Sequence, residues 1–200
     1  LKLFDKQIAD IINGNEVATP IYDFVSGKPR YNAGDVIKLD KKDVLIIEGI
    51  HALNPKILSD ISRKKKYKIY ISPLTCLNLD DQNRISTSDN RLLRRIIRDN
   101  RHRGNYSLKK WASVRLGEEK NIFPFQDEAD VIFNSSLIYE IGVLKTYVEP
   151  LLYSVDMDSP YYEEAKRLIN MLKMFLPIPS DDIPKDSILR EFIGGGCFRQ

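Results

Sequence analysis

The strongest constraint on the fold is an uninterrupted apolar run, Val-Leu-Ile-Ile at residues 44–47, which lies between Asp43 and Glu48. A strand with one face in water alternates apolar and polar residues, whereas an uninterrupted run is typical of a strand covered on both faces in a parallel sheet. Residues 68–72 and 129–133 contain further short apolar runs. We therefore predict three buried strands of one parallel sheet.

Helical periodicity occupies most of the chain around these strands. Apolar residues at helical spacing predict helices at residues 1–13, 54–62, 89–102, 107–120, 137–153 and 160–175. The helix at 89–102 has Ser88 as its expected N-cap and a buried stripe formed by Leu92, Leu93, Ile96 and Ile97. After the first helix, residues 19–25 predict an extended piece, and residues 26–35 a loop or bent hairpin.

This alternation of strands and helices predicts an α/β domain with a parallel central sheet. A doubly wound domain normally has about five strands, so we expect one or two more strands to precede Leu1. Residues 1–153 are predicted to form this domain. Residues 154–200 are predicted to add a helix and an extended arm, held by Ile183, Ile188, Leu189 and Phe192.

Composition excludes several classes of protein. The sequence has neither an apolar run of membrane-spanning length nor a signal-like N-terminus, so we expect a cytoplasmic protein without a membrane span. Its two cysteines, Cys76 and Cys197, are far apart and outside any CxxC motif, which gives no basis for a disulfide framework or a structural zinc site.

Glu48 is the first candidate for a functional residue. It directly follows the apolar run and precedes Gly49, which places its carboxylate at the carboxyl end of the predicted sheet, where open α/β folds bind ligands. An acid at this position can hold Mg²⁺ in phosphoryl transfer. An acid that only caps the following turn would give the same pattern.

Arginines dominate residues 91–103, which contain six arginines and one acid, Asp99. Arg91, Arg95 and Arg98 recur at i, i+4 and i+7, so a helix places them on one face, opposite the apolar stripe. A guanidinium group binds phosphate oxygens bidentately and keeps its charge. The pattern favours phosphate binding; the alternative is a solvated face whose arginines pair with surface acids.

Tyr22 and Phe24 alternate with Asp23 in the extended segment, so both rings project to the same side. Two neighbouring rings can form a wall against which a nucleobase stacks. Burial of both rings in the core is the alternative.

The chain resembles uridine kinases and their phosphoribulokinase relatives in four segments with matching order and spacing: PIYDFVSGKPRY, VLIIEGIHALNP, RLLRRIIRDNRHRG and ADVIF. A longer stretch beginning WASVRLGEEKNIF and the tail ILREFIGGGCF are similar to bacterial nucleoside kinases fused to threonyl-tRNA-synthetase-like TGS modules. The resemblance implies a P-loop kinase fold.

The resemblance also implies roles in holding the nucleoside and the metal. Tyr22 and Phe24 match the aromatic residues that hold the uracil ring, and Glu48 matches the acid near Mg²⁺. Gly27 stands where uridine kinases usually have a base-contacting histidine, which puts base selectivity in doubt.

Three arginines match phosphate or nucleoside contacts in the same family. Arg95 matches an arginine that touches the nucleoside, whereas Arg98 and Arg103 match lid arginines that fold over the ATP phosphates. The usual Arg-Gly-Arg is replaced by Arg103-Gly104-Asn105, so one phosphate contact is in doubt.

The phosphate-binding loop GxxxxGK[ST] does not occur in the sequence. At the only Gly-Lys pair, Gly27-Lys28, the first glycine of the motif is replaced by Tyr22 and the hydroxyl residue by Pro29. The resemblance places this loop, and the Asp that acts as base toward the ribose hydroxyl, before Leu1. We therefore expect a C-terminal fragment that does not catalyse by itself.

For the full-length protein, we expect a nucleoside kinase of the uridine or cytidine type, dependent on ATP or GTP and on Mg²⁺. Its partners would be the nucleoside, the nucleoside triphosphate and the upstream P-loop and TGS-like segments, and homo-oligomerisation is left open. An alternative of another class is an RNA- or ribosome-associated regulator that uses a degenerate kinase fold as a nucleotide switch.

Overall fold

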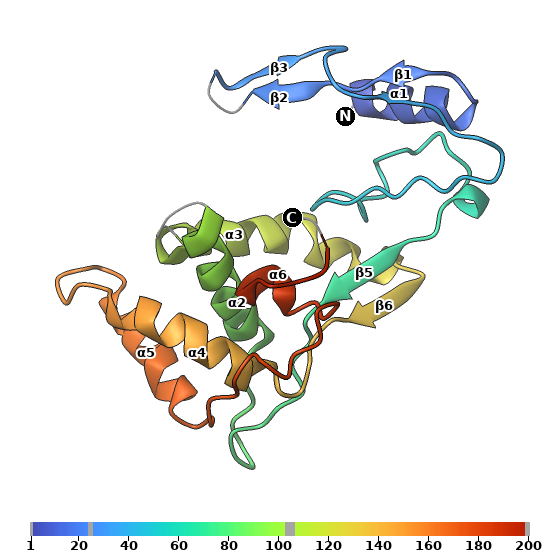
Figure 1. The fold of residues 1–200 in the computed structure, drawn as a ribbon. Coiled ribbons are helices and arrows are strands. Elements are labelled where there is room, and N and C mark those ends of the chain that lie inside the picture. Colours follow the sequence, from blue (N-terminus) through green and yellow to red (C-terminus); the bar gives the residue numbers. More distant parts are fainter. Residues whose placement is uncertain (1, 24–25, 103–106, 199–200) are drawn as a thin grey trace. The chain divides into compact units, whose positions relative to one another are not determined.

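The computed structural model describes residues 2–23, 26–102 and 107–198 (Figure 1). The chain divides into two compact units. The first unit contains Leu1–Tyr70 and Glu118–Val131, and the second contains Ile71–Gly117 and Ile132–Gln200. The domain boundary predicted after residue 153 stays a prediction.

The first unit begins with the predicted N-terminal helix, α1 (Lys2–Ile12), which buries Ile8 and Ile11. The helix ends as predicted at Asn13-Gly14. Gly14 has a φ of +86°, a left-handed conformation that glycine adopts without steric penalty. Its N–H donates to the carbonyl of Ile11 at 2.9 Å, which closes the last turn.

Four short strands follow α1 as a β-ribbon. A loop or a bent hairpin was predicted for residues 26–35; the hairpin that forms begins earlier, at Ile21, and its second strand, Lys28–Arg30, lies within that range. β1 (Val17–Ala18) pairs antiparallel with β4 (Val36–Ile37), and β2 (Ile21–Asp23) pairs antiparallel with β3 (Lys28–Arg30). The hairpin between β2 and β3 therefore carries Tyr22 on its first strand.

The predicted buried strand at residues 44–47 is wrong. Residues 43–48 belong to no helix or strand, and Val44 and Ile46 are 83% and 87% exposed as whole residues. An apolar segment becomes a buried strand only where neighbouring strands accept its backbone hydrogen bonds and other elements cover its side chains. No described residue forms a β-ladder with this segment.

The predicted helix at residues 54–62 is also wrong. This segment consists of successive turns and leads into a short 3₁₀ helix, η1 (Arg63–Lys65). Leu58 has a φ of +55°, and a left-handed residue cannot continue a right-handed helix. Its N–H donates instead to the Asp5 carboxylate at 2.9 Å.

The other two predicted strands are present and parallel. β5 (Ile69–Ser72) pairs with β6 (Val131–Asn134), and both arrows point the same way in Figure 1. The carbonyl of Lys68 accepts from the N–H of Asp130 at 2.8 Å, and the carbonyl of Ser72 accepts from the N–H of Ser135 at 3.0 Å.

Burial of these two strands was predicted wrongly. Every residue of β6 is exposed, and Ile69 and Ile71 of β5 are exposed as well. Two strands leave many apolar side chains uncovered because the described elements do not sandwich them between layers. The 3₁₀ helix η2 (Phe123–Glu128) leads into β6.

The second unit contains the main core, built by the predicted helices. These are α2 (Thr87–His102), α4 (Glu140–Tyr153) and α5 (Tyr162–Leu172), while α3 (Ser107–Asn121) runs across the boundary between the units. α4 packs against both α2 and α5 (Figure 1). None of the described helices has the length and apolar content needed to cross a membrane.

The predicted apolar stripe of α2 lies in this core. Its members are Leu92, Leu93, Ile96 and Ile97, and they share the core with Ile141, Leu144, Val148, Leu168 and Leu172. Each fully buried side chain of this kind contributes roughly 1.5–3 kcal/mol. The N-cap of α2 was predicted at Ser88, but the cap is Ser86, whose Oγ accepts from the N–H of Asp89 at 3.2 Å.

The tail after α5 is extended, with one short helix, α6 (Arg190–Ile193), that packs against α2. Three of its predicted anchors, Ile183, Leu189 and Phe192, are buried, whereas Ile188 is exposed. The tail therefore belongs to the core of the second unit.

Candidate functional site

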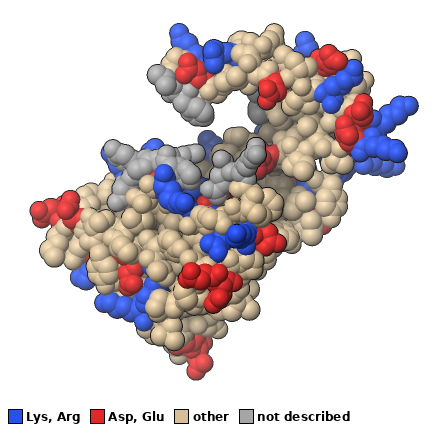
Figure 2. All heavy atoms as spheres, viewed as in Figure 1, with Lys and Arg blue, Asp and Glu red and all other residues tan. Residues whose placement is uncertain are grey.

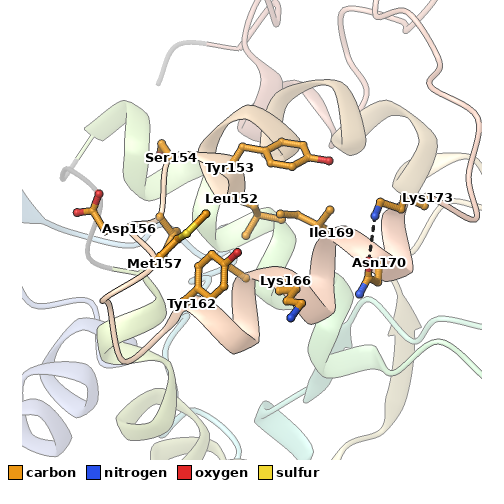
Figure 3. Close-up of a pocket in the computed structure, with 12 residues that line it drawn as sticks. Leu152, Tyr153, Ser154, Asp156, Met157, Tyr162, Lys166, Ile169, Asn170 and Lys173 are labelled. Carbon is orange, nitrogen blue, oxygen red and sulfur yellow. Dashed lines mark hydrogen bonds between the residues drawn. The ribbon is translucent and has the colours of Figure 1, made fainter.

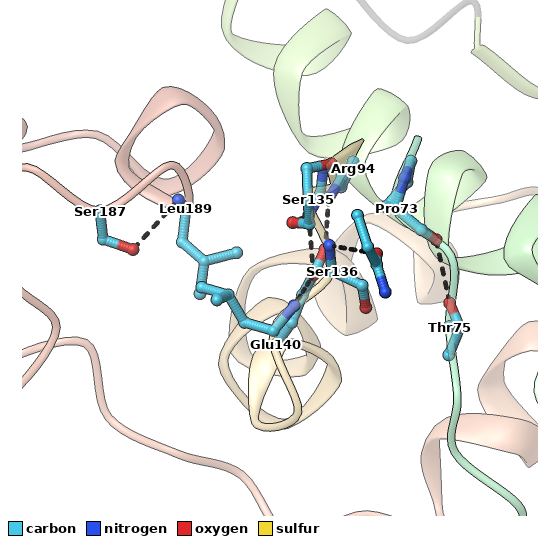
Figure 4. A network of polar contacts seen from close by, with 10 residues as sticks. Pro73, Thr75, Arg94, Ser135, Ser136, Glu140, Ser187 and Leu189 are labelled. Carbon is cyan, nitrogen blue, oxygen red and sulfur yellow. Dashed lines mark hydrogen bonds and ion pairs between the residues drawn. The ribbon is translucent and has the colours of Figure 1, made fainter. Parts of the chain in front are cut away.

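One arginine of α2, Arg94, is buried and structural. Its guanidinium forms an ion pair with both carboxylate oxygens of Glu140, with Nη2 2.7 Å from Oε2 (Figure 4). Nη2 also donates to the carbonyl of Ser135 at 2.8 Å. The Glu140 side chain is fully buried, and its Oε2 accepts from the N–H of Leu137 at 3.0 Å. The pair fastens α2 to the start of α4.

A second buried carboxylate, Asp99, lies between two predicted ligand-binding arginines. Arg95 Nε is 3.2 Å from Asp99 Oδ2, an ion-pair distance without hydrogen-bond geometry, and Arg98 Nη2 is 3.5 Å from Oδ1. The Oγ of Ser107, the first residue of α3, donates to Oδ2 at 2.8 Å. One acid therefore restrains both arginines and joins α2 to α3.

Arg95 and Arg98 remain accessible in part. Their side chains are 19% and 36% exposed, whereas that of Asp99 is 5% exposed. Pairing of the arginines with acids agrees with the alternative weighed above, except that Asp99 and Glu140 are buried rather than surface acids. Phosphate binding by Arg95 and Arg98 stays a prediction, and Arg103 lies outside the described residues.

Tyr22 is exposed on the β2–β3 hairpin rather than buried in a core. The residue is 51% exposed, and its hydroxyl donates to the carbonyl of Gly27 at 3.1 Å across the hairpin. The ring thus has a surface that a planar ligand could contact. Phe24 lies outside the described residues.

Glu48 is exposed at the start of a turn. Gly49 follows with a φ of +151°, and its carbonyl accepts from the N–H of Ala52 at 3.0 Å. Within the described ranges, no group of three His, Cys, Asp or Glu side chains is arranged to hold a metal. A single carboxylate still suits Mg²⁺, which proteins usually bind through one or two carboxylates together with water and substrate phosphates.

The sequence-predicted residues divide between the two units. Tyr22 and Glu48 belong to the first unit, and Arg95 and Arg98 belong to the second. Of the predicted site residues, the structure brings together Arg95 and Arg98 around Asp99.

A pocket of about 520 Å³ lies elsewhere in the second unit, between the end of α4 and α5 (Figure 3). Tyr153, Met157, Tyr162 and Lys166 are among its lining residues. Its lining contains none of the residues predicted from sequence to bind nucleoside or phosphate.

Comparison with known proteins identifies the family. Residues 1–142 match the Phosphoribulokinase / Uridine kinase family, and this range includes Tyr22, Glu48 and all of α2. The chain belongs to this family. The match ends within α4, so most of α4, all of α5 and the tail lie beyond it.

Relatives of the chain include proteins named uridine kinase. Those of Staphylococcus aureus strains JH9, Newman and MW2 are each 30% identical over 157 residues, which cover 75% of this chain and 66% of the relative. The chain thus spans about two thirds of the length of these uridine kinases. Family membership agrees with the α/β composition and with the parallel pairing of β5 and β6.

The ion pairs that hold α2 in place were not predicted from the sequence. The spacing of Arg95 and Asp99, at i and i+4, could have revealed their ion pair. Glu140 is 46 residues from Arg94, and nothing in the local pattern of either segment predicts that pair.

A third ion pair, at the first turn of α2, was also missed. Arg167 of α5 donates to Asp89 at 2.6 and 3.0 Å and to Glu164 at 2.8 and 2.9 Å. The hydrogen bonds from Arg167 hold the pKa of Glu164 below its usual value, and the two carboxylates raise the pKa of Arg167.

Proposed function

We propose that this chain forms part of a nucleoside kinase that transfers the γ-phosphoryl group of ATP or GTP to the 5′-hydroxyl of uridine or cytidine. The observation that carries the proposal is the family match over residues 1–142, which includes every residue assigned a role below. The relatives named uridine kinase support a pyrimidine nucleoside as acceptor.

In this proposal Tyr22 and Phe24 hold the base and Arg95 contacts the nucleoside. The exposed ring of Tyr22 supports a stacking role, because an aromatic face must be accessible to contact a base. The contact between Arg95 and Asp99 supports a fixed direction for the guanidinium before ligand binds. Orientation in advance lowers the entropy lost on binding.

Arg98 and Arg103 are proposed to bind the transferring phosphoryl group. Phosphoryl transfer proceeds by in-line displacement, and its transition state spreads negative charge over the equatorial oxygens. Guanidinium groups aimed at these oxygens stabilise that charge, most strongly where lid closure excludes water. The ion pair of Arg98 with Asp99 would hold it ready for this role.

Glu48 is proposed to hold Mg²⁺, either directly or through water. Its exposed carboxylate, at the start of a turn, supports this role. When bound, Mg²⁺ neutralises charge on the β and γ phosphates. Glu48 would supply one ligand, and phosphate oxygens and water would supply the others.

Backbone amides that cradle the β-phosphate must come from elsewhere, because residues 1–200 contain no GxxxxGK[ST] motif. We propose that residues outside this range, with the P-loop and TGS-like modules, complete the enzyme, and that residues 1–200 alone do not catalyse. A cytoplasmic location and homo-oligomerisation stay predictions.

The test is phosphoryl transfer from ATP or GTP by the full-length protein, with uridine, cytidine and guanosine as acceptors. We expect turnover with a pyrimidine nucleoside. Arg98→Ala should lower kcat about 10²–10³-fold through loss of transition-state stabilisation, while Lys109→Ala, an exposed basic residue of α3, should leave it unchanged. The absence of turnover with every nucleoside would refute the proposal.

The RNA-associated alternative receives less support. Non-specific binding to RNA requires several accessible basic side chains along one surface, but Arg95 and Arg98 are partly buried and paired with Asp99. On the face drawn in Figure 2, Lys and Arg side chains are interspersed with Asp and Glu. Salt-sensitive RNA affinity that is lost in an Arg95→Ala, Arg98→Ala variant would reverse this preference.

A further inference from the structure

Helix α2 lies inside the family-matched range, yet segments beyond residue 142 hold it in place. They contact the helix at its first turn, in its middle and near its end. Each contact involves a charged side chain of α2. Because the three contacts lie at different points along the helix, together they restrain the orientation of α2 as well as its distance from α5 and the tail.

The first-turn contact comes from α5. Arg167 binds both carboxylate oxygens of Asp89, with Nη2 2.6 Å from Oδ1 and Nη1 3.0 Å from Oδ2. Glu164 binds the same guanidinium from one turn earlier in α5. A bidentate arginine–carboxylate pair restrains orientation as well as distance.

The middle contact comes from Phe192 in the tail. The guanidinium of Arg94 lies over its ring, with Cζ 5.1 Å from the centroid. Phe192 and Arg94 are both buried, and a desolvated cation–π contact is stronger than an exposed one. The ring therefore completes the surroundings of a guanidinium whose other partners are Glu140 and Ser135.

The third contact also involves Phe192, through its backbone. Arg101 Nη1 donates to the carbonyl of Phe192 at 3.2 Å. Gly194 makes room for this guanidinium: its φ is +82°, and a Cβ there would overlap the Arg101 guanidinium. Arg94 and Arg101 are seven residues apart and face the same side of α2, so one tail segment holds two points about 10.5 Å apart along the helix.

Hydrogen bonds and buried side chains also hold the tail segment around Phe192 in place. Arg190 donates to the carbonyls of Ser180 at 2.9 Å and Gly194 at 3.2 Å. Leu189 and Ile193 are buried in the core on either side. Phe192 is thus presented by an ordered segment.

We propose that α5 and the tail, residues 162–197, act as a positioning element for α2 and thereby set the affinity of its arginine face for a nucleoside triphosphate. Arg167, Phe192 and Gly194 are positioning residues: they touch α2, and α2 carries Arg95 and Arg98. The ligand in this inference rests on the proposed function, whereas the positioning does not. A displacement of about 1 Å in the groups that contact a ligand can lower their effect by up to about 10²-fold. Contacts that fix the position of α2 should therefore affect how well its arginines bind the nucleotide.

The experiment compares four variants of the full-length protein by amide hydrogen exchange of α2 and by titration with a fluorescent ATP analogue and Mg²⁺. Phe192→Leu keeps an apolar side chain but removes the ring under Arg94. Gly194→Ala displaces Arg101. Arg167→Gln releases the first turn from the surface, so it remains informative if a core variant fails to fold. Ile178→Ala is the matched control, because Ile178 lies in the same tail but packs on Gly142 of α4.

We expect exchange in α2 to rise about tenfold and nucleotide affinity to fall about 3–10-fold in the first three variants, since release of a local contact lowers the free energy of local opening. Ile178→Ala should lower Tm and leave α2 exchange close to wild type. Equal α2 exchange in all four variants overturns the positioning role, and faster exchange with unchanged affinity overturns its link to the nucleotide. Faster exchange in a protein whose wild type binds no nucleotide supports positioning and counts against the proposed function instead.

Discussion

The helical core of the second unit and the two-stranded sheet differ in how far their apolar side chains are buried. Leu92, Leu144 and Leu168 are fully buried between helices, whereas Ile71 and Ile132 on β5 and β6 are exposed. Both regions contain large apolar side chains. The helices α2, α4 and α5 bury one another's apolar side chains. A strand, in contrast, needs neighbouring strands at both edges and other elements covering both faces before its apolar side chains are buried.

The two regions also differ in their ion pairs. Arg94 and Glu140 are buried among helices, whereas Arg63 and Asp130 form an ion pair beside β6 in which the Arg63 side chain is half exposed. Hydrogen bonds from Arg63 and from the N–H of Lys68 lower the pKa of Asp130. A buried pair and an exposed pair should respond very differently to removal of one partner.

The largest expected effect is that of Glu140→Ala. This change leaves the Arg94 guanidinium buried without its carboxylate and should lower the free energy of unfolding by about 3–5 kcal/mol. Urea denaturation measures it. Asp130→Ala is the control from the exposed pair, and a loss of similar size in that variant would contradict the contrast between the two pairs.

Next in size is Leu168→Ala, which removes a fully buried side chain of α5 and should lower stability by about 2–5 kcal/mol. Ile132→Ala, on the exposed face of β6, should change it by no more than about 0.5 kcal/mol. Thermal unfolding of both variants compares them directly. A comparable loss in Ile132→Ala would mean that β6 is covered in solution.

Asp99→Asn should have an intermediate effect, about 1–3 kcal/mol, because hydrogen bonds to charged groups are worth more than neutral ones. The variant keeps the shape of the side chain but weakens its hold on Arg95 and Arg98. Ser107→Ala, which removes only a neutral donor to the same carboxylate, should lose less. A larger loss of unfolding free energy in Ser107→Ala than in Asp99→Asn would show that the neutral hydrogen bond contributes more than the ion pairs, contrary to this prediction.

The smallest effect concerns pH and Glu164. Hydrogen bonding to Arg167 lowers the pKa of Glu164 below its ordinary 4.5, so the pair stabilises the fold above that pH, and this contribution disappears as the pH falls through the lowered value. At neutral pH, Glu164→Gln should lose at most about 1 kcal/mol because the pair is partly exposed. Urea midpoints of wild type and variant should converge at low pH; a gap that stays constant with pH would exclude this assignment.

Most of the helices were predictable because each carries its own periodicity; the helix predicted at residues 54–62 is the exception, since that segment forms turns. The stripe of Leu92, Leu93, Ile96 and Ile97 specifies the buried face of α2 without knowledge of what covers it. The apolar run at residues 44–47 could not be assigned in the same way, because an extended segment becomes a strand only when another strand pairs with it. For the same reason β5 and β6 were located correctly while their burial was not.

The candidate site divides in a similar way. The clustering of arginines and their common face follow from spacing alone, and the structure confirms that Arg95 and Arg98 lie together. Partners far along the chain, such as Glu140 for Arg94 and Phe192 for Arg101, depend on tertiary packing. The N-cap of α2 was predicted at the wrong serine because Ser86 and Ser88, two residues apart, both have a hydroxyl that can accept from a backbone N–H.

The contacts at Asp89, Arg94 and Arg101 have a mechanical consequence. A helix pinned at both ends and at its centre cannot tilt as a separate flap without breaking at least one of three charged contacts. Any movement that folds arginines over a bound nucleotide must therefore either carry α5 and the tail along with α2 or be confined to the arginine side chains.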